Sequence, residues 1–227
     1  MPTVVVAGAS RGIGLEFVRQ YAADGWSVIA GCRDPARAEA LNAVFGEVEV
    51  HALDVASGGS VATFAAAVGE RPVDLLLAVA GVFGGDHQHR PGEIDYDAWL
   101  RTLAVNTLGP VRLLDALLPN LKAGEGRRFV ALTSGMGSTA ENGGGYIAYR
   151  SSKAALNNAV KTLSLALAND GIVCVALNPG WVKTDMGGPS ARLTPEESVS
   201  AMRERIAGYG PADSGRFLSW DGKQFEW

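Results

Sequence analysis

The chain has 227 residues, a length typical of one α/β domain, and its 47% hydrophobic content excludes a disordered chain. Its net charge of -4 is spread along the sequence without a block of Lys or Arg, so no nucleic-acid partner is expected. No apolar run approaches the ~18 residues of a membrane span, and the start lacks a signal-peptide pattern. Cys32 and Cys174 lie far apart in apolar segments, which indicates a reducing compartment, the cytoplasm, and no disulfide.

Short apolar runs alternate with longer segments of helical periodicity along the chain, which is typical of a parallel sheet connected by helices. The predicted strands are Val4–Ala7, Ser27–Gly31, Val48–Ala52, Asp74–Val79, Arg128–Thr133, Ile172–Leu177 and one near Phe217. The predicted helices are Gly12–Ala23, Pro35–Phe45, Ser60–Val68, Tyr96–Leu121, Tyr149–Ala168 and Pro195–Ala207. We therefore expect residues 1–227 to form one doubly wound α/β domain with a seven-stranded parallel sheet in the order 3-2-1-4-5-6-7.

Two helix starts carry capping signals. Asp34-Pro35 has the residue types of an N-cap and first turn, and Thr194 with Glu197 three residues later fits a capping box.

A glycine-rich segment follows the first strand and opens the first helix. Glycine lets such a turn tighten and lets the backbone approach a pyrophosphate, whose charge favours the helix N-terminus. A tight strand–helix turn without a ligand is the alternative, but the strand–turn–helix context favours a dinucleotide. The residues expected to contact it here are Gly8, Ser10, Arg11, Gly12, Ile13 and Gly14.

The tip of the second strand bears on the choice of dinucleotide. A carboxylate at that tip would bind the adenosine ribose hydroxyls, but Cys32 stands at this position and Arg33 follows it. With Arg11 in the glycine turn, two guanidinium groups favour the 2′-phosphate of NADP(H), while NAD(H) stays open. The alternative is that both arginines are ordinary solvated surface residues.

Further cofactor contacts are expected where later strands end. Asp54 could accept a hydrogen bond from the adenine amino group or could simply turn the chain before the next helix, and the sequence leaves both interpretations open. The segment after the sixth strand could face the nicotinamide, or it could be an ordinary Pro-Gly turn. The expected contacts in these segments are Asp54, Val55, Ala80, Gly81, Pro179, Gly180, Val182 and Thr184.

Tyr149 and Lys153 are four residues apart, so a helix places them on one face. A phenol with a pKa of ~10 is a poor acid or base at pH 7, and a nearby ammonium is expected to lower that pKa. Ser134 ends the preceding strand and could donate to the same substrate oxygen. A chance spacing is the alternative, but behind a phosphate-binding turn the pair indicates carbonyl reduction.

In their order and spacing, these residues resemble the short-chain dehydrogenase/reductase family over essentially the whole chain. The matching positions are Gly8, Gly12, Gly14, Asp54, Ala80, Gly81, Asn106, Ser134, Tyr149, Lys153, Pro179 and Gly180. The resemblance implies a catalytic set of Asn106, Ser134, Tyr149 and Lys153, with Tyr149 as general acid/base in NADP(H)-dependent hydride transfer to a carbonyl or from an alcohol. Lys153 would also hold the nicotinamide ribose, and Asn106 would position a water that refills the proton.

A closer resemblance is to the C-factor and sniffer-type carbonyl reductases, carried by segments 133–138, 148–153 and 220–222. The chain departs from the family at Ala78-Val79-Ala80-Gly81, where Asn-Asn-Ala-Gly is frequent, which puts local support of the sheet in doubt. Tyr146, seven residues before Lys153, has the spacing of the enoyl reductase branch. That branch has a different glycine turn, so we assign the acid to Tyr149 and Tyr146 to the pocket.

The remaining features give weaker evidence of function. His87 and His89 lie in a loop, where no further ligands complete a metal site, so no metal is expected. The C-terminal aromatic residues Phe217, Trp220, Phe225 and Trp227 could pack the last strand onto the core or wall a substrate pocket. The family resemblance implies a homodimer or homotetramer, although monomers occur in the subgroup. The C-factor resemblance leaves a second function open, a dinucleotide-binding sensor with little turnover.

Overall fold

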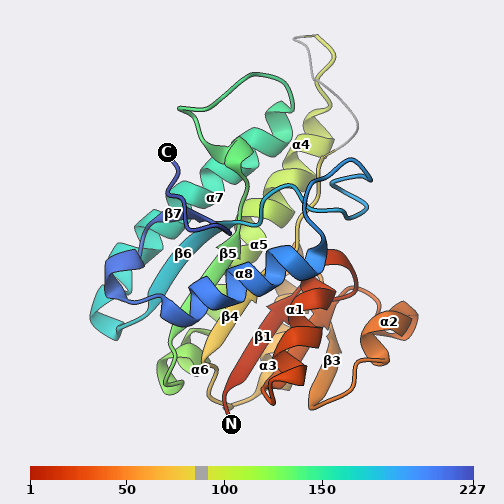
Figure 1. Cartoon of the computed structure of the whole chain (residues 1–227), viewed down its shortest axis with the longest axis vertical. Coiled ribbons are helices and arrows are strands. Elements are labelled where there is room, and N and C mark those ends of the chain that lie inside the picture. Colours follow the sequence, from red (N-terminus) through yellow and green to blue (C-terminus); the bar gives the residue numbers. More distant parts are fainter. Residues whose placement is uncertain (85–91) are drawn as a thin grey trace.

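The computed structural model describes residues 1–84 and 92–227, and its strands form one seven-stranded sheet (Figure 1). All neighbouring strands are parallel, in the order β3-β2-β1-β4-β5-β6-β7, which confirms the predicted topology. The strands are β1 (Thr3–Ala7), β2 (Ser27–Cys32), β3 (Val48–Ala52), β4 (Leu75–Ala78), β5 (Arg128–Leu132), β6 (Val173–Asn178) and β7 (Phe217–Ser219).

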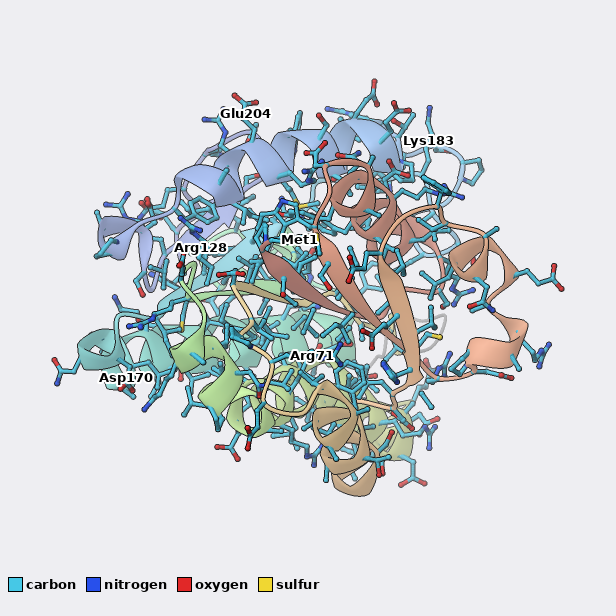
Figure 2. The ribbon with its side chains drawn as sticks, turned by 90° about the horizontal axis from the view of Figure 1, so that it is seen from below. Met1, Arg71, Arg128, Asp170, Lys183 and Glu204 are labelled. Carbon is cyan, nitrogen blue, oxygen red and sulfur yellow. The ribbon has the colours of Figure 1, made fainter. Side chains whose placement is uncertain are left out.

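Helices cover both faces of this sheet. They are α1 (Gly12–Ala23), α2 (Glu39–Asn42), α3 (Gly58–Val68), α4 (Tyr96–Leu103), α5 (Gly109–Ala116), α6 (Leu118–Ala123), α7 (Ile147–Ala166) and α8 (Pro195–Gly208). Seen from the N-terminal ends of the strands (Figure 2), α1 and α8 lie on one face and α3 on the other. Successive strand residues therefore alternate between two cores: Val4 and Val6 pack with α1 and α8, whereas Val5 packs with α3, α5 and α7.

Two predicted helices are wrong in extent. The segment predicted as a helix over Pro35–Phe45 forms a 3₁₀ turn over Pro35–Arg37 and then the short α2, because Ala38 leaves helical geometry with φ -92° and ψ 53°. The side chain of Asp34 makes no capping bond.

The helix predicted over Tyr96–Leu121 is divided into α4, a π-helical turn (Ala104–Leu108), α5 and α6. Pro119 at the start of α6 has no N–H to continue the preceding helix, so a new helix begins there. The π turn matters for the site, because it carries the buried Asn106 and Thr107.

The capping box predicted for α8 is confirmed. The Glu197 N–H donates to Thr194 Oγ1 at 3.2 Å, and the Thr194 N–H donates to Glu197 Oε2 at 2.8 Å. The cap of α3 is Ser57, whose Oγ accepts from the Ser60 N–H at 3.3 Å.

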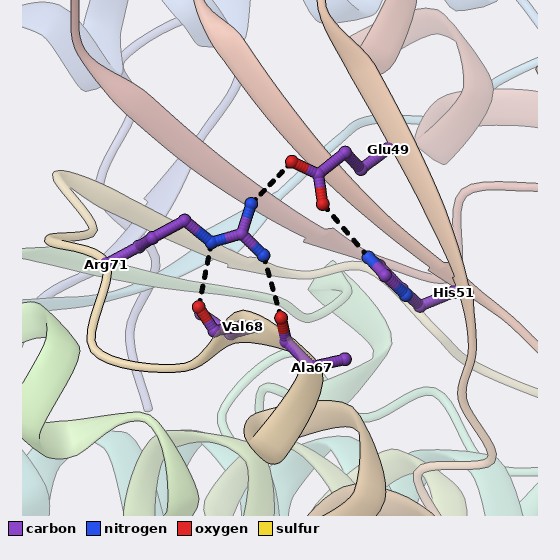
Figure 3. Close-up of polar contacts among 5 residues, drawn as sticks. All are labelled: Glu49, His51, Ala67, Val68 and Arg71. Atoms are coloured by element: carbon purple, nitrogen blue, oxygen red, sulfur yellow. Dashed lines mark hydrogen bonds and ion pairs between the residues drawn. The ribbon is translucent and has the colours of Figure 1, made fainter.

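Arg71 fastens the edge strand β3 to the end of α3 (Figure 3). Its Nε and Nη2 donate to the carbonyl oxygens of Val68 and Ala67 at 2.8 and 2.9 Å, so it caps the last turn of the helix. Its Nη1 lies 2.5 Å from Glu49 Oε1, and the other Glu49 oxygen lies 3.2 Å from His51 Nε2.

The predicted packing of C-terminal aromatic residues is confirmed. The Phe217 ring centroid lies 4.7 Å from that of Phe225 and 5.9 Å from that of Trp227. In the part of the chain that the structure describes, no helix combines the length and apolarity that crossing a membrane requires.

Candidate active site

The candidate site lies at the carboxyl ends of the central strands. Parallel strands bring these ends to one edge of the sheet, where open α/β sheets bind ligands. The glycine turn follows β1, Gly81 follows β4, Ser134 follows β5 and Pro179 follows β6, so segments far apart in the sequence meet there.

Close packing fixes the three glycines of the turn. Gly8 has φ +96° and Gly12 has φ +54°, a conformation that favours glycine. A Cβ on Gly8 would lie 2.6 Å from the Ala80 nitrogen, and one on Gly14 would overlap the Gly8 carbonyl oxygen. A side chain at Gly8 or Gly14 would therefore force the turn away from its neighbours in the fold.

The N-terminus of α1 is suited to an anion. Arg11 occupies the N-cap position and its side chain makes no capping bond, while the first N–H groups of a helix have no intrahelical acceptor. The N–H groups of Gly8 and Ala9 donate to the Gly31 oxygen at 2.8 and 3.0 Å, which anchors the turn to β2. These features fit the diphosphate of a dinucleotide.

Arg11 has a partner that the sequence analysis did not anticipate. Its Nη1 lies 2.6 Å from Asp185 Oδ2, and both side chains are largely exposed. The loop of Asp185 is held by its own turn, in which the Gly188 N–H donates to the main-chain carbonyl oxygen of Thr184 at 2.8 Å. Thr184 also meets the glycine turn, because a Cβ on Gly12 would lie 3.1 Å from its methyl group.

Cys32 and Arg33 lie at the tip of β2, as expected. Cys32 is buried and burial raises the pKa of its thiol, while Arg33 is exposed and makes no ion pair with any residue in 1–84 or 92–227. No carboxylate therefore ends this strand, and an arginine is exposed beside it.

Asp54 turns the chain after β3. Its Oδ1 accepts from the Ala56 N–H at 2.9 Å, and its own N–H donates to Ser60 Oγ at 2.8 Å. This geometry supports the turn interpretation, and a bond to adenine stays a prediction. Val55 is buried against Gly109, so its side chain contributes to packing.

Tyr149 and Lys153 lie on one face of α7 and both are buried. Lys153 Nζ donates to the Leu132 oxygen at 2.8 Å and lies 5.8 Å from the centroid of the Tyr149 ring. Burial lowers the pKa of the Lys153 ammonium to about 8. Asn157 continues the same helical stripe and accepts from Thr133 Oγ1 at 2.5 Å, a contact that the four-residue spacing could have suggested.

The direction of the Tyr149 pKa corrects an expectation. The nearby ammonium was expected to lower this pKa, but burial of the phenol raises it, and the neighbouring Ser134 hydroxyl offsets part of that rise. Desolvation dominates here because the side chain is nearly inaccessible to water. Ser134 itself caps a 3₁₀ turn, with its Oγ accepting from the Met136 N–H at 3.2 Å.

Asn106 has a structural task in the loop after β4. Its Oδ1 accepts from the Val82 N–H at 2.8 Å, while its Nδ2 donates to the Val82 oxygen at 2.8 Å and to Ser152 Oγ at 3.0 Å. Both amide hydrogens are therefore in use. This clamp, with the Val79 and Ala80 N–H groups bonded to the Ala7 oxygen, supplies the support that Ala78-Val79-Ala80-Gly81 had put in doubt.

An aromatic cluster surrounds the phenol. The Phe83 ring centroid lies 4.7 Å from that of Tyr149 and 5.1 Å from that of Tyr146. Tyr146 precedes α7 with φ +50°. Phe83 belongs to no motif, so the sequence offered no signal for it.

A surface depression of about 500 Å³ lies beside the N-terminal part of α7, with Met136, Ile147 and Arg150 among its walls. Its lining includes neither Tyr149 nor Lys153, so we do not assign the substrate to it. Residues 1–84 and 92–227 hold no cluster of three or more His, Cys, Asp or Glu side chains suited to a metal ion. His87 and His89 lie outside the described residues.

An anion-binding turn facing a buried phenol and lysine is typical of dinucleotide-dependent oxidoreductases. The family model described as short chain dehydrogenase matches residues 2–193. The chain therefore belongs to the short-chain dehydrogenase/reductase family, and it is an oxidoreductase.

Individual relatives agree with this assignment. The C-signal of Myxococcus xanthus is 47% identical over 165 residues, which cover 72% of this chain and 98% of that protein. The NADPH-bound carbonyl reductase from chicken fatty liver is 33% identical with a TM-score of 0.91, over 100% of this chain and 99% of that chain. The carbonyl reductase Sniffer of D. melanogaster is 31% identical with a TM-score of 0.92, over the full length of both chains. The resemblance to this subgroup is thus confirmed.

Proposed function

We propose that the protein is an NADP(H)-dependent oxidoreductase that transfers hydride between nicotinamide and a carbonyl or hydroxyl group of a small molecule, with Tyr149 as general acid/base. The observation that carries the proposal is the buried Tyr149 phenol, with Ser134 and Lys153 beside it, at the sheet edge that holds the open N-terminus of α1. NADPH in the chicken carbonyl reductase, which has the same fold, supports the choice of coenzyme.

Tyr149 can supply the proton that reduction requires. A phenol with its ordinary pKa of ~10 is protonated at neutral pH, and burial, which raises the pKa of Tyr149, leaves it so; the proton is then available to the developing alkoxide. Ser134 orients the carbonyl oxygen by donating a hydrogen bond to it. A bound nicotinamide dinucleotide supplies the hydride.

Other residues of the site hold the coenzyme in this proposal. The first turn of α1 binds the diphosphate through backbone N–H groups, Arg33 and Arg11 bind the 2′-phosphate, and Lys153 binds the nicotinamide ribose. Asn106 positions a water for proton refilling. The remaining expected contacts are Asp54, Val55, Ala80 and Gly81 on the adenosine side and Pro179, Gly180, Val182 and Thr184 on the nicotinamide side.

The test is oxidation of NADPH, followed by absorbance, with a panel of aldehydes, ketones and quinones. We expect turnover with at least one class, and loss of that turnover in Tyr149→Phe. Absence of turnover with every class, in protein that binds NADPH, would contradict the proposal.

A second function is favoured by the 47% identity to the C-signal of Myxococcus xanthus, whose name describes a signal. In that case the protein would be a dinucleotide-binding sensor or signalling protein, and tight coenzyme binding without turnover would identify it. A buried proton donor is unnecessary for binding alone, which favours the enzyme. The cytoplasmic location and the homodimer or homotetramer expected from the sequence stay predictions.

A further inference from the structure

Phe83 packs directly against the candidate catalytic phenol. Its ring lies 4.7 Å from the Tyr149 ring, centroid to centroid, with 37° between the planes, and 5.1 Å from the Tyr146 ring at 61°. Phe83 is only partly buried and belongs to neither of the two hydrophobic cores formed by the described residues. The position of the Phe83 ring is therefore not explained by packing into either core.

The backbone on both sides of Phe83 is held in place. On one side, both polar groups of the Val82 backbone bond to the Asn106 side chain at 2.8 Å. On the other, Gly84 has φ +85° and packs so closely on Thr102 that a Cβ would overlap the Thr102 hydroxyl. Asn106 and Thr102 are fully buried, so the position of the Phe83 ring is determined by the interior of the protein.

The same clamp reaches the helix that carries the phenol. Asn106 Nδ2 donates to Ser152 Oγ at 3.0 Å, and Ser152 Oγ donates to the main-chain carbonyl oxygen of Tyr149 at 2.7 Å. The buried side-chain amide of Asn106 thus bonds both to the loop that carries Phe83 and to the first turns of α7. The backbone segments that carry the two rings are consequently joined by a short chain of hydrogen bonds.

We propose that Phe83 is a positioning residue that fixes the orientation of the Tyr149 ring and excludes water from one face of it. The inference rests on the proposed role of Tyr149 as general acid. Without an aromatic neighbour the phenol gains room to rotate about its Cα–Cβ bond, which moves the hydroxyl away from the substrate oxygen. A displacement of about 1 Å can lower a rate by roughly 10²-fold.

The experiment compares Phe83→Leu with Phe83→Tyr, which retains the ring. The matched control is Phe45→Leu, the same substitution at a residue that is 97% exposed. For each variant, kcat and KM are measured with saturating NADPH and the best substrate of the carbonyl panel, together with the NADPH Kd and Tm.

We expect Phe83→Leu to lower kcat by roughly 10- to 100-fold with a much smaller change in KM, since the lost interaction acts in the transition state. Phe83→Tyr and Phe45→Leu should keep kcat within about threefold of wild type, and NADPH Kd should change by less than about threefold in all variants. If Phe83→Leu does not fold, Phe83→Met provides the same comparison with a longer side chain.

A kcat within about twofold of wild type in Phe83→Leu, while Tyr149→Phe is inactive, would overturn the inference and leave the proposed function intact. A loss of kcat in Phe83→Tyr as large as in Phe83→Leu would also overturn it, because the ring would then be irrelevant. Full turnover in Tyr149→Phe would overturn the proposed function and the inference with it.

Discussion

Lys153 Nζ donates a 2.8 Å hydrogen bond to the carbonyl oxygen of Leu132, the last residue of β5. The bond joins α7 to the sheet beneath the candidate site and holds the ammonium in a buried position. Burial lowers the pKa of the ammonium to about 8. The residue assigned to coenzyme binding therefore lowers the free energy of unfolding at neutral pH.

We expect Lys153→Met to abolish turnover and to stabilise the protein at pH 7. The pKa is about 8 in the folded chain against 10.5 for an ordinary lysine, so between these values the unfolded chain binds more protons. Stability of the wild type therefore rises with pH across that interval, and the gain from Met should be roughly 1–3 kcal/mol at pH 7 and vanish above pH ~10.5. Urea denaturation of both proteins at pH 7 and pH 10 measures this.

Lys161→Met is the control, since Lys161 is an exposed lysine on the same helix and its replacement should change the free energy of unfolding little at either pH. If Lys153→Met were less stable than wild type at pH 7, the hydrogen bond to Leu132 would outweigh the burial of the charge.

Tyr149→Phe should lower turnover by ~10²- to 10⁴-fold, because the ring is kept and the proton donor is lost. NADPH affinity should change little. Tyr146→Phe, made at the neighbouring tyrosine three residues earlier, should cost far less in the same assay. Should Tyr146→Phe be the more damaging change, the assignment of the acid would be wrong and the enoyl reductase interpretation would gain support.

The coenzyme preference should depend on Arg33. A charge-assisted hydrogen bond contributes ~1.5–3 kcal/mol, so loss of this arginine should weaken NADPH binding by roughly 10- to 150-fold and affect NADH little. Cys32→Asp combined with Arg33→Ala should reverse the preference, because a carboxylate accepts the ribose hydroxyls and repels the phosphate. The dissociation constants are compared at one salt concentration, because salt screens exposed charges.

Arg37→Ala, at another exposed arginine in the following 3₁₀ turn, is the matched control for Arg33→Ala. Equal affinities of the wild type for NADPH and NADH, or tighter NADH, would remove the basis for the preference. Arg11 and Arg33 would then be ordinary surface residues.

Glu49→Gln should destabilise the protein at pH 7 by less than about 1 kcal/mol, because the pair with Arg71 is partly exposed to solvent. Hydrogen bonds from Arg71 and then His51 lower the Glu49 pKa, so this stabilisation is present above the unfolded pKa and is lost as pH falls through the folded pKa. The difference from wild type in urea denaturation should therefore shrink as pH falls from 7 toward 4.

Arg71→Met should cost more than Glu49→Gln at pH 7, since it also leaves the last carbonyl groups of α3 without a donor. Glu204→Gln, at an exposed position of α8 (Figure 2), controls for the loss of one surface carboxylate. A pH-independent effect of Glu49→Gln would show that its ionisation plays no part.

Gly14→Ala should destabilise the fold by roughly 1–3 kcal/mol, the usual cost of overpacking, because the new Cβ would overlap the Gly8 carbonyl oxygen. Gly58→Ala is the matched control: it lies in the first turn of α3 with no atom within 4 Å of the added Cβ, so alanine should be neutral or stabilising. Thermal denaturation compares them, and equal Tm values would contradict the packing argument.

The sequence predicted the parallel sheet and the helical face that Tyr149 and Lys153 share, because both follow from patterns that the sequence carries. Continuous apolar runs identified buried strands such as β6, and residue spacing placed Tyr149 and Lys153 on one helical face, as the structure confirms. Breaks inside helices were missed, because the π turn at Asn106 is fixed by bonds to Val82 and Ser152, which are distant in the sequence.

The rest of the site depends on long-range contacts that no local pattern encodes. Asp185 meets Arg11 from 174 residues away, and Phe83 reaches Tyr149 only through the packing of the loop after β4. The direction of the Tyr149 pKa was also beyond the sequence, because it depends on how completely the phenol is desolvated.

The overlap that a side chain at Gly14 would produce with Gly8 has a consequence for how such chains diverge. A descendant that stopped binding a coenzyme would still need glycine at position 14, because the strand and helix meet there whether or not a ligand is present. Arg33, which is exposed just after the tip of β2, carries no comparable steric demand and would be free to drift. Loss of coenzyme use would thus appear first at the end of β2, while the glycine pattern persisted.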